Sequence, residues 1–132
     1  MRAGALVAAA VAMLAGPALT APLACRIDQK FSCTREGCVP ALAGSSFSRI
    51  DFERGIYALC AYRGCDEYPA TIWRGGVYIN IELRGHSAFA KLSDTRNDQV
   101  FPDELQALHL LEVTSMGLVT LVSYGTCTED KR

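Results

Sequence analysis

Apolar and polar residues alternate most clearly over residues 77–83, which have the sequence Val-Tyr-Ile-Asn-Ile-Glu-Leu. A period of two is typical of a β-strand with one face turned toward a core. Arg74-Gly75-Gly76 precedes this segment and Arg84-Gly85-His86 follows it, and glycine pairs at both ends favour tight hairpin turns. We therefore expect residues 77–83 to be the middle strand of an antiparallel meander.

Each turn fixes a strand register, so the two turns can be compared with the alternation. A two-residue turn at Gly85-His86 places Ile79 opposite Leu92, and one at Gly75-Gly76 places Ile79 opposite Ile72. Both registers keep the same face of the middle strand apolar. The two turns therefore predict one three-stranded sheet with Ile79, Ile81 and Leu83 facing inward.

Two further hairpins are predicted from three-residue loops that end in glycine. The loop Glu53-Arg54-Gly55 would place Ile50 opposite Ala58, and the loop at residues 115–117 would pair Val113 with Val119. Residues 101–104, Phe-Pro-Asp-Glu, carry the proline and acids of a helix start and predict a single helical turn.

Seven or eight short strands joined by tight turns predict an all-β fold in which an antiparallel meander closes into a small β-barrel. A two-sheet β-sandwich is the alternative. Residues 21–132 form one predicted domain, with a cysteine-rich N-terminal arm at residues 25–44 and no second-domain boundary.

The first 20 residues have a different character and predict a secretory signal peptide. Met1-Arg2 is a short positive start, and an apolar run over residues 3–15 is followed by Gly16-Pro17. Cleavage after Thr20 suits the small-residue rule, and cleavage after Ala24 is the alternative. A lipid anchor on Cys25 is not favoured, because Pro22 stands where a lipoprotein signal has leucine.

Removal of Arg2 with the leader leaves 12 basic and 14 acidic residues. No basic run remains that would indicate nucleic acid or an anionic membrane surface as a partner. The chain after the leader also has no apolar stretch long enough for a transmembrane helix. We expect a periplasmic or secreted protein.

Six cysteines follow the leader, an even number typical of a disulfide framework in a small exported domain. Among 15 connectivities we expect two local bridges, Cys33–Cys38 and Cys60–Cys65, and one long bridge, Cys25–Cys127. A four-thiolate zinc site is the alternative for the two Cys-x4-Cys pairs, but an oxidising compartment favours disulfides. No motif predicts a cofactor.

The outward face of the predicted sheet carries aromatic side chains among polar ones. Trp73 is expected opposite Tyr78, and Phe89 opposite Glu82. Because tyrosine and tryptophan are common where a surface is partly apolar and partly wet, this face is a candidate binding surface. Its predicted binding residues are Trp73, Tyr78, Phe89, Asn80 and Lys91. The alternative is that the N-terminal arm or a loop covers the rings.

No catalytic residue is predicted. His86 and Ser87 are neighbours on a strand end and would point to opposite faces, and His109 is distant in the sequence. Five acids, expected on outward faces or at strand ends, are interpreted as solvated charges: Asp51, Asp66, Glu67, Glu82 and Glu112.

Several short motifs together resemble small, uncharacterised exported proteins of proteobacteria. They are Gly44-Ser45-Ser46, Gly64-Cys65-Asp66, Asn80-Ile81-Glu82, residues 88–92 (Ala-Phe-Ala-Lys-Leu) and residues 122–127 (Val-Ser-Tyr-Gly-Thr-Cys). The resemblance implies a periplasmic or secreted location and implies no activity. In size, signal and expected barrel the chain is also similar to periplasmic inhibitors of c-type lysozyme, although their Ser-Gly-x-x-Tyr loop is absent.

The sequence therefore leads to one main hypothesis and two others. The main hypothesis is a non-enzymatic exported β-barrel that binds a protein or an envelope component through the Trp73, Tyr78 and Phe89 face. The alternatives are a structural envelope protein without a specific ligand, and a hydrolase or lysozyme-inhibitor-like protein. A pocket in which His109 meets an acid would favour the hydrolase.

Overall fold

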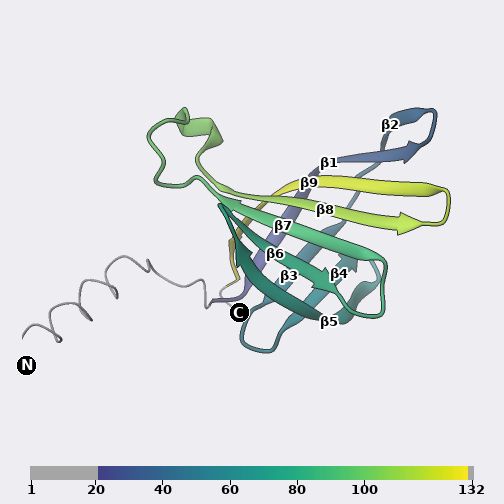
Figure 1. Ribbon diagram of the computed structural model, residues 1–132, viewed down its shortest axis with the longest axis horizontal. Coiled ribbons are helices and arrows are strands. Elements are labelled where there is room, and N and C mark those ends of the chain that lie inside the picture. The colour runs from purple at the N-terminus through teal and green to yellow at the C-terminus, as the bar shows by residue number, and fades with distance from the viewer. Residues whose placement is uncertain (1–20, 131–132) are drawn as a thin grey trace, which may run out of the picture.

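The computed structural model describes residues 21–130, so the predicted signal peptide lies outside the described residues. This part of the chain consists of nine β-strands and one short 3₁₀-helix (Figure 1). The strands are β1 (Leu23–Thr34), β2 (Gly37–Ala41), β3 (Phe47–Asp51), β4 (Ile56–Ala61), β5 (Gly64–Gly75), β6 (Tyr78–Leu83), β7 (Ala88–Asp94), β8 (Leu108–Met116) and β9 (Val119–Glu129). The helix, η1 (Asp103–Leu105), is the predicted helical turn.

Eight of the strands form a closed antiparallel barrel, which confirms the predicted fold class rather than the sandwich. Strands β3 to β9 follow one another as a meander, and β1 closes the ring because it pairs with both β3 and β9. Strand β1 is long enough to change partners. Its first half, through Arg26, pairs with β3, and its second half, from Lys30, pairs with β2. The predicted cysteine-rich arm, residues 25–44, therefore contains most of a barrel strand and a projecting hairpin.

The two ends of the barrel differ in their connections (Figure 1). The loop end carries the β3–β4 and β7–β8 loops, the β5–β6 turn, the start of β1 and the end of β9. The hairpin end carries the β4–β5, β6–β7 and β8–β9 turns, and the β1–β2 hairpin extends beyond it. No helix among residues 21–130 is long and apolar enough to cross a membrane.

The meander around β6 is close to its prediction. The β6–β7 register is confirmed, with Ile79 opposite Leu92 and Ile81 opposite Ala90. The β5–β6 register is wrong by two residues, since Ile72 lies opposite Ile81. The reason is that Gly76, at a positive φ of 63°, is the first residue of the turn and Val77 the second. A shift of two residues leaves every side chain on its predicted face.

The other two predicted registers are also wrong, and their shifts are odd. The β3–β4 loop has four residues, 52–55, so Ile50 lies opposite Tyr57 instead of Ala58. The β8–β9 turn has two residues, 117–118, so Val113 lies opposite Val122. An odd shift exchanges the two faces of one strand relative to the other. Cys60 therefore lies on the opposite face from Ser48.

All three predicted disulfides are present. They are Cys25–Cys127, Cys33–Cys38 and Cys60–Cys65, and no cysteine is free. Cys25–Cys127 lies in the core and links the first strand of the barrel to the last. The three bridges fit an oxidising environment. The core around this bridge contains mainly aliphatic side chains, among them Leu23, Ile50, Ile81, Leu92, Leu108 and Leu110.

Candidate functional site

The five predicted binding residues share the outer face of the sheet formed by β5, β6 and β7. The two-residue shift in the β5–β6 register changes their order, so that Trp73 lies opposite Asn80 and not opposite Tyr78. Asn80 in turn lies opposite Lys91, which completes a row across three strands. Phe89 lies opposite Glu82, as predicted.

Within residues 21–130, neither the segment 25–44 nor a loop covers the three rings. Trp73 is 46% exposed, and Tyr78 and Phe89 are each 43% exposed. Intermediate exposure means that each ring keeps part of its surface against the sheet and offers the rest to solvent. The predicted alternative, in which the chain itself covers this face, is therefore wrong.

The structure adds a groove that the sequence did not predict, which we call the aromatic groove. It has a volume of about 620 Å³ and lies on the outer surface beside the β7–β8 loop. Its apolar lining comes from strands β6 to β9 and from the loop. These residues are Tyr78, Phe89, Phe101, Leu105, Leu110, Leu111 and Tyr124. Its polar lining is Lys91, Ser93, Thr95 and His109.

A second groove, of about 520 Å³, adjoins the first and contains Trp73, Asn80, Glu82 and His86. Phe89 and Lys91 line both grooves, so they stand on the ridge between them. The Lys91 ammonium lies 5.3 Å from the centre of the Tyr78 ring, within the range of a cation–π contact. The predicted surface is thus divided, with Tyr78 in one groove and Trp73 in the other.

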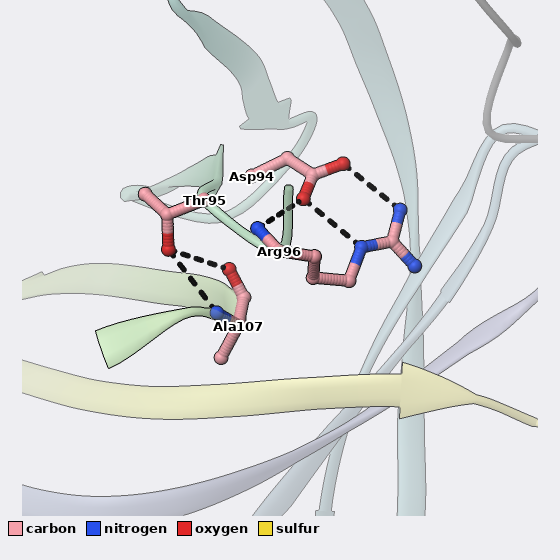
Figure 2. Close-up of polar contacts among 4 residues, drawn as sticks. All are labelled: Asp94, Thr95, Arg96 and Ala107. Carbon is pink, nitrogen blue, oxygen red and sulfur yellow. Dashed lines mark hydrogen bonds and ion pairs between the residues drawn. The ribbon is translucent and has the colours of Figure 1, made fainter. Parts of the chain in front are cut away.

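The β7–β8 loop is fastened at its base by Thr95 (Figure 2). The Thr95 backbone N–H donates to the Ala107 carbonyl at 3.0 Å, and the Ala107 N–H donates to the Thr95 hydroxyl at 3.1 Å. The hydroxyl oxygen also lies 2.5 Å from the Leu105 carbonyl. These bonds join the two ends of the loop, so Phe101 and Leu105 are held at the border of the groove.

An ion pair lies beside these hydrogen bonds of Thr95. The Arg96 side chain donates two hydrogen bonds to the Asp94 carboxylate, each of 2.9 Å, and its backbone N–H donates a third (Figure 2). The side-chain bond holds the pKa of Asp94 below its ordinary value and raises that of Arg96. Both side chains are about 40% exposed, so the pair contributes little stability.

The two histidines lie at opposite ends of the barrel. His109 Nε2 is 2.8 Å from the Leu105 carbonyl oxygen, and because a carbonyl only accepts, Nε2 carries the hydrogen. No carboxylate lines the groove with it, so no acid and base pair is found there. His86 stacks on Tyr68 with ring centres 4.7 Å apart.

The interpretation of Glu112 as a solvated outward charge is wrong. Glu112 is 8% exposed and points into the barrel, where it accepts hydrogen bonds from Ser48 at 2.6 Å and from Tyr57. Burial raises the pKa of the Tyr57 hydroxyl well above its ordinary value, and the nearby Glu112 charge raises it further. The alternation along β8 hid this cluster, because the apolar residues Leu111 and Val113 lie on the other face of the strand and suggested that this other face points inward.

The other four acids agree better with their interpretation. Asp66, Glu67 and Glu82 are exposed, and Asp51 is half-buried and accepts from the Arg54 backbone N–H at 3.0 Å. Within residues 21–130 no three histidine, cysteine or acidic side chains gather where they could hold a metal ion.

Comparisons with known proteins add no relative. No protein-family model matches the chain, and no curated protein or solved structure matches it significantly. The resemblance to exported proteobacterial proteins stays a hypothesis, and the function is inferred from the residues of this barrel alone.

Proposed function

We propose that the protein is an exported, non-enzymatic binding domain that contacts a protein or another cell-envelope component through the aromatic groove. The observation that carries the proposal is the group of half-exposed rings around one apolar groove, Tyr78, Phe89 and Tyr124. Partly exposed aromatic side chains supply large apolar area at low entropic cost when a partner covers them.

The composition of the groove suits recognition of a partner that is both apolar and polar. The aromatic rings line it, and Lys91, Ser93 and His109 add hydrogen-bonding groups to the same lining. Apolar anchors surrounded by polar groups are typical of protein interfaces. The hydrogen bonds of Thr95 hold the β7–β8 loop in place before binding, which lowers the entropic cost of association.

The location follows from two features. The predicted signal peptide directs the chain out of the cytoplasm, and three disulfides persist in an oxidising compartment. We therefore propose the periplasm or the extracellular space as the place of action.

A capture experiment tests the proposed function. The tagged protein and a Tyr78→Ser/Phe89→Ser double variant are incubated with an envelope extract, and the retained proteins, lipids and glycans are identified by mass spectrometry. We expect the specific capture by the double variant to fall at least tenfold, because the variant lacks two of the aromatic rings that line the groove. A separate Trp73→Ser variant reports whether the adjoining groove belongs to the same surface.

The chain offers a matched control in Tyr62, which is 91% exposed on the β4–β5 turn and lines neither groove. Tyr62→Ser should capture the same components as the wild type. All variants are first checked for three disulfides by intact mass and for an unchanged unfolding transition. Equal capture by the wild type and a folded double variant would contradict the proposal, and would favour a structural envelope protein.

A further inference from the structure

The barrel interior contains a cavity that is distinct from the two outer grooves, and we call it the barrel-mouth cavity. It has a volume of about 250 Å³ and is lined by residues of β1, β3, β4, β5, β8 and β9 near the hairpin end. Its lining includes two acidic residues, Glu112 and Asp66, and one basic residue, Lys30. It lies on the opposite side of the strand wall from the aromatic groove, so its ligand is independent of the proposed outer partner.

Glu112 is the most unusual group in this cavity. Ser48 and Tyr57, which are 1% and 0% exposed, both donate to the same oxygen, Oε2. No lysine, arginine or histidine in residues 21–130 lies within ion-pair distance of the carboxylate. A charge on a side chain that is only 8% exposed is costly unless a partner of opposite charge or several donors offset it. Here only two neutral hydroxyls do so.

The second oxygen of Glu112 is open to the cavity. Neither of these hydrogen bonds reaches Oε1, and no buried side-chain oxygen or nitrogen of the described residues lacks a hydrogen bond. Oε1 therefore keeps contact with the solvent in the cavity. The two hydroxyls fix the carboxylate so that this oxygen faces an incoming ligand.

The remaining lining indicates which ligand would fit. With two acidic residues and one basic residue, the lining carries a net negative formal charge, which attracts a cation. Ile27, Leu59 and Leu121 supply apolar walls beside them. An ammonium or guanidinium group forms short, charge-assisted hydrogen bonds with a carboxylate, and a short aliphatic body would pack against the walls.

We propose that the barrel-mouth cavity binds a small organic cation, whose ammonium or guanidinium group donates to Oε1 of Glu112. Lys30 lines the same cavity and acts as a tethered competitor for that oxygen. The same chemistry is offered by a free small amine and by the side chain of a lysine or arginine in a peptide, and the size of the cavity limits either to a short chain.

Nuclear magnetic resonance with defined probes tests this assignment. The ¹⁵N-labelled protein is titrated with n-butylammonium chloride, with uncharged n-butanol, and with the tripeptide Ala-Lys-Ala. We expect saturable shifts of the Ser48, Leu59 and Ser123 amides with n-butylammonium and at least tenfold weaker binding of n-butanol. Binding of the tripeptide as well would show that a peptide side chain can enter, and its failure would show that the cavity selects free amines.

Three variants sharpen the result. Glu112→Gln keeps the size of the side chain and should bind n-butylammonium at least tenfold more weakly. Lys30→Met removes the competitor and should bind it more tightly. Glu82→Gln removes an exposed charge on the outer face and should leave binding unchanged.

Three results would overturn the assignment. They are no saturable shift with any cationic probe in the wild-type protein, equal binding of n-butanol and n-butylammonium, or weaker cation binding in Lys30→Met. If Glu112→Gln does not fold, the comparison of the two butyl probes and the Lys30→Met titration still decide the matter.

Discussion

Two walls of the barrel, the β6–β7 hairpin and the β8–β9 hairpin, differ in the side chains that they turn toward the interior. The side chains of β6 and β7 that pack in the core are all aliphatic: Ile79, Ile81, Leu83, Ala88, Ala90 and Leu92. The inward positions of β8 and β9 include a carboxylate, a hydroxyl and a glycine, namely Glu112, Ser123 and Gly125. The first wall is a simple core face, while the second also closes the barrel against β1 and borders the barrel-mouth cavity.

On their outer faces, the second wall carries aliphatic side chains where the first wall carries Asn80, Glu82 and Lys91 among its rings. On β8 and β9 the outward positions include Leu111, Val113 and Val122, which are only partly buried. Apolar alternation alone therefore cannot tell inside from outside on this hairpin. The comparison shows that a strand pattern locates a core only where the interior is uniformly apolar.

The strongest way to break the second wall is to remove its disulfide. We expect the double substitution Cys25→Ser/Cys127→Ser to lower the free energy of unfolding by about 4–5 kcal/mol, because the bridge closes a loop with a sequence separation of 102. Cys33→Ser/Cys38→Ser, with a separation of 5, should cost about 2 kcal/mol. Urea unfolding of both oxidised variants measures the difference. Equal losses would show that loop closure does not govern the contribution of these bridges.

A smaller but more local disruption is Gly125→Ala. A Cβ atom at Gly125 would lie 2.1 Å from the backbone carbonyl oxygen of Arg26, where β9 meets the irregular part of β1. We expect a loss of about 3 kcal/mol, because backbone must move to relieve the clash.

The control for this substitution is Gly75→Ala at the end of β5, the strand that pairs with the first wall. There the new Cβ would lie 2.8 Å from Asn80 Nδ2, the end of a side chain that can rotate away, so the cost should stay below about 1 kcal/mol. Thermal or urea unfolding compares the two. Similar losses at both positions would contradict the tight β1–β9 contact.

The smallest effect concerns the buried hydroxyl of Tyr57 and appears only at alkaline pH. Its pKa in the folded protein is raised well above its ordinary value of 10.0, so the folded state keeps this proton while the unfolded state releases it. The stabilisation is complete below pH 10 and is lost as the pH rises above it. Relative to Tyr57→Phe, the wild type should lose up to roughly 1.4 kcal/mol between about pH 10 and 11.

Parallel urea unfolding of both proteins at these pH values measures this change. The comparison with Tyr57→Phe cancels the other groups that titrate in the same range. A difference in stability that does not change with pH would mean that Tyr57 has the same pKa in the folded and unfolded states, and it would contradict this prediction.

The parts of the structure that the sequence predicted share a physical cause. The barrel, the β6–β7 register and the disulfide pairs depend on alternation, turn glycines and cysteine spacing, which are local properties. The outer face of β5–β7 was also predicted, because a two-residue shift preserves faces. The aromatic groove was not, since Phe101, Leu105 and Tyr124 reach Tyr78 and Phe89 only through closure of the sheet. The cluster of Ser48, Tyr57 and Glu112 was hidden for the same reason, because its members are 55 and 64 residues apart.

The pairing of β1 with β9 has a consequence for the order in which the protein is made. The two strands are the first and last of the described chain, so the ring cannot close until residues 119–129 have been synthesised. Until then β1 and β8 each expose an unpaired edge, the feature that leads incomplete sheets to aggregate. Cys25 also cannot pair with Cys127 before then, and four cysteines nearer in the sequence are synthesised first. We therefore expect a disulfide isomerase to speed formation of the native bridges.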